Sequence, residues 1–331
     1  MKKTFDVIVV GELNVDLILN QIESFPEMGK EKIAQQMTLT LGSSSAIFAS
    51  NLSSLGAKVA FLGKIGRDAF GDLVLSSLQM KKVDTSMIIQ DESLATGATI
   101  VLNFSNDRAM VTHPGAMDHL SIHDISEDQL KKAKHLHFSS YFLQPKMKPN
   151  IDKLFKQAKE LGLTTSFDAQ WDPSEKWDID LPNVLPYVDV FLPNEVEALH
   201  LSGQKTLSAA LDKLAKLGNI IVIKLGGKGS ISRQGDSIFE AKAFLNKNVV
   251  DAIGAGDSFN AGFIAKFIQG KSVKECQIYG NLMGAISTTQ PGGTTAFSNL
   301  SDILNIAQKR FGYSDTNTKI HSPVSKIQKK S

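Results

Sequence analysis

The stretch that decides the fold is Asp251-Ala-Ile-Gly-Ala-Gly-Asp-Ser-Phe-Asn-Ala-Gly262, which places a glycine turn directly before an apolar helix. Gly254 and Gly256 let backbone N–H groups converge without obstruction by a Cβ atom. The helix, expected to begin near Asp257, adds the partial positive charge of its N-terminus, so the turn predicts an anion site. A carboxylate is an unfavourable phosphate ligand there. Asp257 is therefore predicted to accept a proton from a substrate hydroxyl during phosphoryl transfer, and the alternative is an ordinary N-cap aspartate.

This segment resembles the C-terminal signature of the ribokinase or PfkB family of carbohydrate kinases, Asp-Thr-x-Gly-Ala-Gly-Asp-x-Phe, and departs from it by Ala252 at the threonine. The resemblance continues in the same order of elements over about residues 7–306. It implies a ribokinase-like α/β fold, ATP as the phosphoryl donor and a sugar as the acceptor. It also implies that the phosphoryl group is stabilised in transfer by the backbone of Gly254, Ala255 and Gly256.

Composition bounds the rest of the chain: 331 residues with 42% apolar content can form one large α/β domain or two ordinary ones. A net charge of +2, without interleaved aromatic and basic residues, gives no reason to expect nucleic acid as a partner. Cys276 is the only cysteine, which excludes an intramolecular disulfide and fits a reducing compartment. The N-terminal Met-Lys-Lys-Thr-Phe-Asp runs straight into a strand without a signal peptide, so a cytoplasmic protein with no membrane partner is expected.

Short β-branched runs alternate with amphipathic stretches along most of the chain, as in βαβ units of a mostly parallel sheet flanked by helices. Strands are predicted at Val7–Val10, Val59–Ile65, His135–Phe138, Thr164–Asp168, Val188–Leu192 and Ile220–Leu225. Helices are predicted at Ala46–Leu55, Phe70–Met80, Ile151–Leu161 and Leu207–Leu217. Residues 1–312 are expected to form one kinase domain, and the polar, Lys-rich residues 313–331 a disordered tail.

Two segments break this rhythm, Leu13–Leu41 and Ala98–Val111, which alternate apolar and polar residues without an intervening helix. Alternation of this kind predicts a small antiparallel sheet with one exposed face. In the resembled family these two pieces form a β-lid over the sugar, which often also serves as a dimer surface. The resemblance thus implies a homodimer joined through the lid.

The acceptor side of the expected site begins at Gly11-Glu-Leu-Asn-Val-Asp16, directly after the first strand. Asn14 and Asp16 occupy alternate positions, so both side chains can project into one cleft and bond vicinal hydroxyls. Taken without the resemblance, an Asn-x-Asp pair after a strand is more typical of a turn. The resemblance assigns both residues to sugar binding.

The stretch Leu41-Gly-Ser-Ser-Ser-Ala-Ile-Phe-Ala-Ser-Asn-Leu52 resembles the N-terminal family signature, a Gly-Gly pair before a helix with a sugar-contacting asparagine one turn in. Gly42 matches, whereas Ser43 replaces the second glycine and Ile47 replaces the asparagine. The serines at 43–45 either supply hydroxyls to the substrate or cap the helix. Because Ile47 cannot bond a hydroxyl, D-ribose is predicted to be a poor substrate and a deoxy or otherwise less polar acceptor a better one.

The nucleotide side is expected around two further strand ends. Asn194 and Glu197 match an Asn-x-x-Glu element with which the family holds Mg²⁺ and the nucleotide phosphates, and they also have the form of a helix capping box. Asn281 matches a position that lines the adenine pocket, although a lone helical asparagine is more often solvated. The turn after the next strand lacks the order of a P-loop and looks like the family's nucleotide-contacting turn, with Lys224, Gly226, Gly227 and Gly229.

Asp251 stands beside the expected phosphate site, which is an unfavourable position unless a cation offsets its charge. The family commonly binds a monovalent ion there, K⁺ by preference, through this aspartate and backbone carbonyls of the loop that corresponds to Thr288–Thr294. Asp251 and Glu197 are the metal-binding residues that the resemblance implies.

Other polar residues complete the set of candidates. Asp168 and Gln170 follow a strand at the sheet end where open α/β proteins bind ligands, which makes them secondary substrate-binding candidates. His113 follows the second lid segment and is a further candidate for a ligand contact. His135 and His137 share one strand face without a third ligand nearby in sequence, so they are interpreted as edge or packing residues rather than a zinc site.

These residues predict an ATP-dependent kinase that phosphorylates the primary hydroxyl of a small sugar. A nucleoside kinase of the same fold is an alternative, because Ile47 and Phe48 could face a base. A catalytically silent sugar-binding regulator is a second alternative, but it would be expected to lose Asp257 or the glycines before it. A dinucleotide-dependent oxidoreductase is disfavoured because no GxGxxG follows the first strand.

Overall fold

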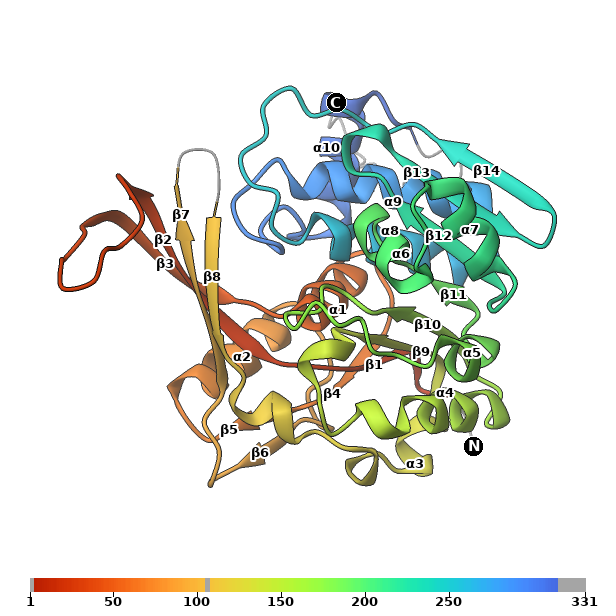
Figure 1. Ribbon diagram of the computed structural model, residues 1–331, viewed down its shortest axis with the longest axis horizontal. Helices are drawn as coiled ribbons and strands as arrows, with labels where there is room; N and C mark the ends of the chain where they lie inside the picture. Colours follow the sequence, from red (N-terminus) through yellow and green to blue (C-terminus); the bar gives the residue numbers. More distant parts are fainter. Residues whose placement is uncertain (1–2, 105–107, 315–331) are drawn as a thin grey trace, which may run out of the picture.

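The computed structural model describes residues 3–104 and 108–314. They form a large sheet that is covered by helices on both faces (Figure 1). The sheet has eight strands in the order β14-β13-β12-β11-β10-β9-β1-β4. Its parallel part is β1 (Phe5–Val10), β4 (Val59–Leu62), β9 (Ala133–Ser139), β10 (Thr164–Asp168), β11 (Val190–Phe191) and β12 (Ile220–Lys224). The strands β13 (Ser230–Gln234) and β14 (Ser237–Ala241) extend it as an antiparallel hairpin. The mostly parallel α/β sheet expected from the sequence is confirmed.

Strand β1 shows why helices are needed on both faces. Val7 and Val9 belong to one apolar cluster and Ile8 and Val10 to another, and all four side chains are fully buried. The first cluster is closed by α1 (Ser44–Ser54), α2 (Ala69–Met80), α8 (Ala255–Phe267), α9 (Val273–Ser287) and α10 (Leu300–Phe311). The second is closed by α3 (Glu127–Leu130), α4 (Ile151–Glu160), α5 (Leu181–Val184), α6 (Glu195–Ser202) and α7 (Leu207–Ala215). Short 3₁₀ turns lie at Gly115–His119, Ile122–Asp124, Tyr141–Leu143, Lys148–Asn150, Leu185–Tyr187 and Gly226–Lys228.

A second sheet projects from this body, in the order β3-β2-β7-β8, and we call it the lid (Figure 1). It consists of the hairpin β2 (Asn14–Ile22) with β3 (Ala34–Leu41) and the hairpin β7 (Gly97–Asn103) with β8 (Arg108–His113). Each hairpin is antiparallel, but β2 and β7 pair in parallel, which corrects the expectation of an antiparallel sheet throughout. The reason is that the first strand of each hairpin leaves the body in the same direction.

The two faces of the lid differ in polarity. Asp16, Thr40 and Thr99 are directly paired across three strands, so they share the inner face with Asn14. The outer face carries an apolar row that crosses all four strands, Leu39, Leu17, Ile100 and Val111, with register pairs between successive members. Leu39, Ile100 and Val111 are 43%, 42% and 66% exposed. We call these four residues the outer lid row.

One predicted strand, Val59–Ile65, is divided in the structure. The chain leaves β4 at Leu62 and continues after Gly63 as β5 (Lys64–Gly66), which pairs with β6 (Ile89–Asp91) in a separate small sheet. A Cβ added at Gly63 would lie 2.8 Å from the carbonyl oxygen of Gly11, so close approach of two chain segments requires glycine here.

At the C-terminal end the boundary differs slightly from the expected one. Tyr313, assigned to the tail from sequence, lies with its ring centroid 6.2 Å from those of Phe244 and Tyr279. Residues 315–331, the rest of the predicted tail, are outside the described residues. Within the described ranges, no helix combines the length and the apolar character that spanning a bilayer would require.

Candidate active site

The glycine turn opens helix α8 earlier than expected. The helix begins at Ala255 with Gly254 as its N-cap, so Asp257 is the third helical residue and not the cap. Gly254 has φ of 71°, and a Cβ there would lie 2.7 Å from the Cα of Gly293. Only glycine satisfies both conditions, because the conformation is left-handed and the neighbouring backbone occupies the space of a side chain. The turn therefore leaves the N-terminus of a 13-residue helix accessible, which suits an anion.

Asp257 is 8% exposed, and its Oδ1 accepts a hydrogen bond of 2.9 Å from Nε2 of Gln170. Burial, with the nearby carboxylates of Asp168 and Glu12, raises the pKa of Asp257 to about 8, while the ammonium of Lys224 opposes the rise. A carboxylate with a pKa in this range can take a proton near neutral pH. The geometry is that of a general base held beside an anion site.

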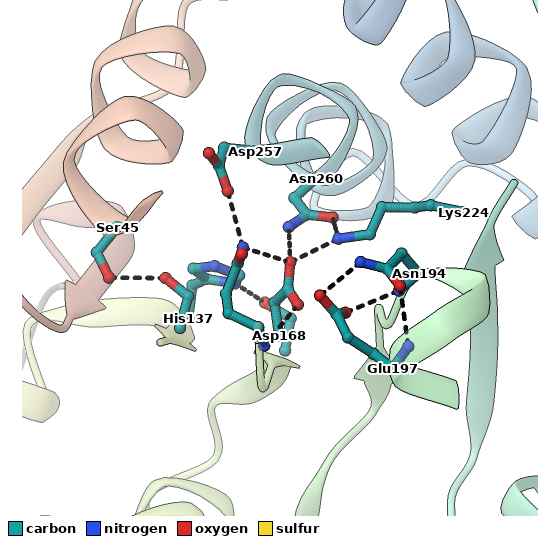
Figure 2. A network of polar contacts seen from close by, with 11 residues as sticks. Ser45, His137, Asp168, Asn194, Glu197, Lys224, Asp257 and Asn260 are labelled. Carbon is teal, nitrogen blue, oxygen red and sulfur yellow. Dashed lines mark hydrogen bonds and ion pairs between the residues drawn. The ribbon is translucent and has the colours of Figure 1, made fainter. Parts of the chain in front are cut away.

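Asp168 is the centre of the polar network around this base (Figure 2). It ends strand β10, is fully buried, and its Oδ2 accepts from Nζ of Lys224 at 2.6 Å and from Nδ2 of Asn260 at 2.5 Å. Gln170 joins the two aspartates, because the same Nε2 that bonds Asp257 donates to Oδ2 of Asp168 at 3.0 Å. Of the two residues predicted as substrate-binding, Gln170 thus contacts the predicted base directly, and Asp168 is connected to it through Gln170.

Asn260 was not assigned a role from sequence, although a signal was present. It stands three residues after Asp257, and residues three apart in a helix lie on the same side. It is 1% exposed, and it contacts both Asp168 and Lys224. An inward-facing asparagine in an apolar helix turn is the pattern that could have identified it.

The residues predicted to bind the acceptor, Asn14 and Asp16, lie in strand β2 of the lid. Nδ2 of Asn14 donates to Oγ1 of Thr99 at 2.8 Å and to Oδ1 of Asp16 at 3.3 Å. A Cβ added at Gly42 would lie 2.3 Å from Oδ1 of Asp16, so the glycine is required for the close approach of these segments. Burial raises the pKa of Asp16 to about 6, with Asn14 and Arg108 opposing the rise. Asn14, Asp16 and Gly42, three of the residues predicted to bind the substrate, are therefore brought together.

Ser43 caps helix α1, which decides between the two alternatives left open for it. Its Oγ accepts from the backbone N–H of Ala46 at 2.9 Å and donates to the carbonyl oxygen of Glu12 at 2.7 Å. With φ of 68°, the residue also occupies the left-handed region that the family fills with glycine. Its hydroxyl is thereby committed to the protein backbone.

Glu12 is a buried carboxylate that sequence reasoning missed. It is 1% exposed and accepts hydrogen bonds from Oγ of Ser45, from Oγ of Ser140 at 2.9 Å and from the backbone N–H of Ser45 at 3.2 Å. Burial raises its pKa, and these hydroxyl and amide donors oppose the rise. The signal was a glutamate in an otherwise apolar run directly after a buried strand. Glu12 ties the start of the lid to helix α1 and to the end of β9.

Ile47 and Phe48 are both buried in helix α1 but contact different parts of the molecule. Ile47 is 4% exposed and packs on the glycine turn, since a Cβ added at Gly254 would lie 3.1 Å from its Cγ2. Phe48 is fully buried and stacks on the ring of His137 at a centroid distance of 3.7 Å. Phe48 is directed into the core, so it does not face a base as the nucleoside kinase alternative expected of it.

His135 and His137 lie side by side in the interior of the large sheet. His135 and His137 are fully buried in β9, an interior strand of the sheet rather than an edge, and both bond Oγ of Ser166 at 2.7 Å. Burial lowers the pKa of His135 to about 3, so the ring is neutral. Among residues 3–104 and 108–314, no three His, Cys, Asp or Glu side chains are grouped closely enough to hold a metal ion. His113 is exposed and shares the outer lid face with Val111, away from Asn14 and Asp16.

The nucleotide-side pair forms the capping box that its spacing predicts. Asn194 caps helix α6, its Nδ2 donates to Oε1 of Glu197 at 2.6 Å, and the N–H of Glu197 returns a bond of 2.9 Å to Oδ1 of Asn194. Burial and the neighbouring Asp168 raise the pKa of Glu197 to about 7, and Lys224 opposes the rise. Mg²⁺ prefers carboxylate oxygens and keeps several waters, so a single buried carboxylate near a phosphate site fits it.

The glycines of the turn after β12 differ in how much space surrounds them. Positions 226 and 227 have open space where a side chain would be, so Gly226 and Gly227 leave the backbone accessible to a ligand. Gly229 has φ of 105°, and a Cβ there would lie 2.0 Å from the carbonyl oxygen of Ala241. Lys224, in contrast, extends its side chain to Asp168 rather than along the turn.

Asn281 and Asp251 both hold backbone segments together. Asn281 is 7% exposed and donates to the carbonyl oxygens of Ala241 and Lys242 at 3.1 and 3.2 Å, so the alternative that it is solvated is wrong. Asp251 accepts from the N–H groups of Ile253 and Gly292, both at 2.9 Å. It thereby joins the glycine turn to the loop at 288–294.

Comparison with known proteins agrees with this geometry. The family model described as pfkB family carbohydrate kinase matches residues 4–300. An uncharacterized sugar kinase of Archaeoglobus fulgidus is 32% identical over 239 residues, which cover 71% of this chain and 92% of that protein. The 2-dehydro-3-deoxygluconokinase of Bacillus subtilis is 29% identical over 257 residues, 74% of this chain and 79% of that protein. The solved structure of adenosine kinase from Sinorhizobium meliloti superimposes with a TM-score of 0.79 at 25% identity, over 89% of this chain and 98% of that one.

Proposed function

The chain belongs to the pfkB family of carbohydrate kinases, and we propose that it transfers the γ-phosphoryl group of ATP to the primary hydroxyl of a small sugar. The observation that carries this proposal is the placement of Asp257 beside the glycine turn at the start of α8. The acceptor hydroxyl would lose its proton to Asp257 while its oxygen attacks the phosphorus. The backbone N–H groups of Gly254, Ala255 and Gly256 would stabilise the phosphoryl group in transfer.

The remaining residues divide between the two substrates. Asn14 and Asp16 would bond hydroxyls of the acceptor on the inner lid face, beside Gly42. Farther along the same face, a cavity of about 770 Å³ between the lid and the loop of Gly292 is lined by Ile18, Asn20 and Thr38, among others, but not by Asn14, Asp16 or Asp257. On the nucleotide side, the open backbone at Gly226 and Gly227 would contact ATP. Asn194 and Glu197 would hold Mg²⁺ through water, and bound Mg²⁺ neutralises phosphate charge.

A deoxygenated sugar acid or sugar is the acceptor class that the structure favours over ribose. Ile47 presents no hydrogen-bond donor or acceptor where the family places an asparagine, and it packs on the glycine turn. An acceptor that lacks a hydroxyl at that point loses nothing there. The similarity to a 2-dehydro-3-deoxygluconokinase supports this class, because that enzyme's named substrate lacks one hydroxyl.

A nucleoside kinase remains the second candidate, because the superposed structure is an adenosine kinase. The buried position of Phe48 removes one reason for it. A catalytically silent regulator is disfavoured, since Asp257 and the glycines are in place.

The test is formation of ADP from MgATP with a panel of acceptors: D-ribose, D-fructose, 2-dehydro-3-deoxy-D-gluconate, D-glucose and adenosine. Asp257→Asn is the control for background hydrolysis. We expect a sugar or sugar acid to stimulate ADP formation and adenosine to have little effect. Stimulation by adenosine alone would establish the second candidate, and no stimulation by any acceptor would contradict the kinase function.

We also propose a homodimer joined through the lid. The outer lid row is contiguous and largely exposed, and an apolar row on a thin sheet is stabilised when a second copy covers it. Ile100→Lys would place a charge in the middle of the row. Light scattering should report a dimer for the wild type and a monomer for this variant, whereas a wild-type monomer at every concentration would contradict the proposal.

A further inference from the structure

Lys224 ends strand β12 and extends its side chain into the polar network rather than into solvent (Figure 2). The side chain is 11% exposed, and Nζ lies 2.6 Å from Oδ2 of Asp168 and 3.4 Å from Oδ1 of Asn260. Burial alone would lower the pKa of Lys224, but Asp168, Glu197 and Asp257 together raise it. The residue is therefore a buried, charged ammonium.

The ammonium also lies beside the glycine turn. A Cβ added at Gly256 would point toward Nζ of Lys224 at 3.7 Å, and that nitrogen is the one atom from elsewhere in the described chain within 4 Å of the point. A side chain at position 256 would therefore extend toward the lysine without meeting another segment of the described chain within 4 Å. A group bound to the backbone N–H groups of the turn would therefore have the ammonium as its neighbour.

The surrounding charges give the lysine more than one partner. Three carboxylates influence it, those of Asp168, Glu197 and Asp257, whereas its direct ion pair is with Asp168 alone. Phosphate oxygens arriving at this point would add negative charge among carboxylates. Such an arrangement is stable only with cations at close range, because charges interact strongly where water is excluded.

We propose that Lys224 is a further catalytic residue, whose ammonium bonds an oxygen of the phosphoryl group while this group passes from ATP to the acceptor. Asp168 and Asn260 hold it in place for that contact. In the step, the bond from phosphorus to the ADP oxygen breaks and the bond to the acceptor oxygen forms. The acceptor proton goes to Asp257, and Lys224 keeps all its protons. This inference rests on the proposed kinase function.

A structural role is the competing explanation, in which Lys224 only neutralises Asp168. The catalytic role and the structural role differ in whether the lysine stabilises a planar group that resembles the transferring phosphoryl. MgADP with aluminium fluoride supplies such a group in place of the transferring phosphoryl. A catalytic lysine stabilises the complex with aluminium fluoride beyond the complex with MgADP alone, whereas a structural lysine affects both equally.

The experiment compares wild type, Lys224→Met, Lys224→Arg and Lys228→Met by thermal unfolding with MgADP, with and without aluminium fluoride, in the presence of the most active acceptor of the panel. Lys228 is the matched control, because it belongs to the same turn and its side chain is 75% exposed. We expect MgADP to raise the unfolding temperature of wild type and of Lys228→Met, and aluminium fluoride to raise it further. Lys224→Met should keep the increase caused by MgADP and lose the further increase caused by aluminium fluoride. Lys224→Arg should keep part of that further increase.

Turnover supplies the second readout. Removal of one donor to a transition-state charge typically lowers kcat by about 10²- to 10³-fold, so Lys224→Met should fall in this range with a smaller change in KM for ATP. If Lys224→Met does not fold, Lys224→Gln, whose neutral amide can still bond Asp168, replaces it. The proposal would be overturned if aluminium fluoride raised the unfolding temperature of the neutral variant as much as that of wild type and if kcat stayed within about threefold of wild type. A wild type that MgADP does not stabilise would contradict the kinase function itself.

Discussion

The phosphoryl side and the acceptor side of the site are built in different ways. On the phosphoryl side, Asp257, Gln170, Asp168, Lys224 and Asn260 bond one another and come from the ends of strands β10 and β12 and from helix α8. On the acceptor side, Asn14 and Asp16 belong to the lid, which projects from the body and has an exposed outer face (Figure 1). Under the proposed function, the groups that act on the phosphoryl group are held by the buried sheet, whereas the groups that bind the acceptor belong to an element with one exposed face.

The largest effect should come from breaking the phosphoryl side at its base. Asp257→Asn keeps the size of the side chain but cannot accept a proton. Turnover should fall by roughly 10²- to 10⁴-fold, while binding of the acceptor changes little. Steady-state kinetics with calorimetric titration of the acceptor would measure both. Turnover near the wild-type level would remove Asp257 from its role.

The acceptor side should be altered most directly at Ile47. Ile47→Asn introduces the side chain that the family aims at the sugar, and a hydrogen bond to a buried hydroxyl is worth about 1 to 3 kcal/mol. The ratio of kcat/KM for D-ribose to that for 2-dehydro-3-deoxy-D-gluconate should therefore rise by roughly 5- to 150-fold. Ile47→Val, which stays apolar, is the control. If wild type uses D-ribose as efficiently as any other acceptor and the asparagine does not improve it, our interpretation of this position is wrong.

The limb of the pH profile at the highest pH should belong to the phosphoryl side, because the pKa of Asp257 is raised further than those of Asp16 and Glu197. The pKa of Asp257 is raised to about 8 in the free protein, and the base is its ionised form, so kcat/KM should fall as the pH drops through about 8. The amide of Gln170 lowers that pKa by donating to the carboxylate, and Gln170→Leu should therefore move this limb to higher pH. Ile47→Asn should leave the limb in place. An unchanged limb in Gln170→Leu would contradict the contact between Gln170 and the base.

The smallest effect concerns the cation beside the glycine turn. Replacing Na⁺ by K⁺ at constant ionic strength should raise activity a few-fold, because a bound ion would offset Asp251 and steady the loop that it joins to the turn. Asp251→Ala should abolish the difference between the two salts. Equal rates of the wild type in both salts would show that no such site operates.

The part of the site that could be predicted from sequence is the part that is local in the chain. Gly254, Gly256 and Asp257 stand within four consecutive positions, and the Asn194–Glu197 capping box spans one helix turn, so spacing alone was informative. The bond from Lys224 to Asp168 joins residues 56 apart, and that from Asn260 to Asp168 joins residues 92 apart. Such contacts depend on the order of strands in the sheet, which no local pattern specifies.

The same reason explains the errors in the fold. The alternation in the lid segments correctly indicated strands with two different faces, but it carries no information on whether β2 and β7 run parallel or antiparallel. Burial was also invisible to local patterns. Glu12 and Asn281 are polar residues whose partners come from distant segments, and both are satisfied in the interior.

The parallel pairing of β2 with β7 has a consequence for the order in which the protein folds. Asn14 pairs with Gly97, so the first hairpin of the lid is complete long before the strand that lies beside it has been synthesised. Contacts between distant segments form slowly, because the intervening chain must first be ordered. During that interval the edge of β2 is open to other chains. We therefore expect substitutions that destabilise β7 to increase aggregation during refolding more than substitutions that destabilise β3. We also expect the lid to be the last part of the molecule whose backbone amides become protected from hydrogen exchange.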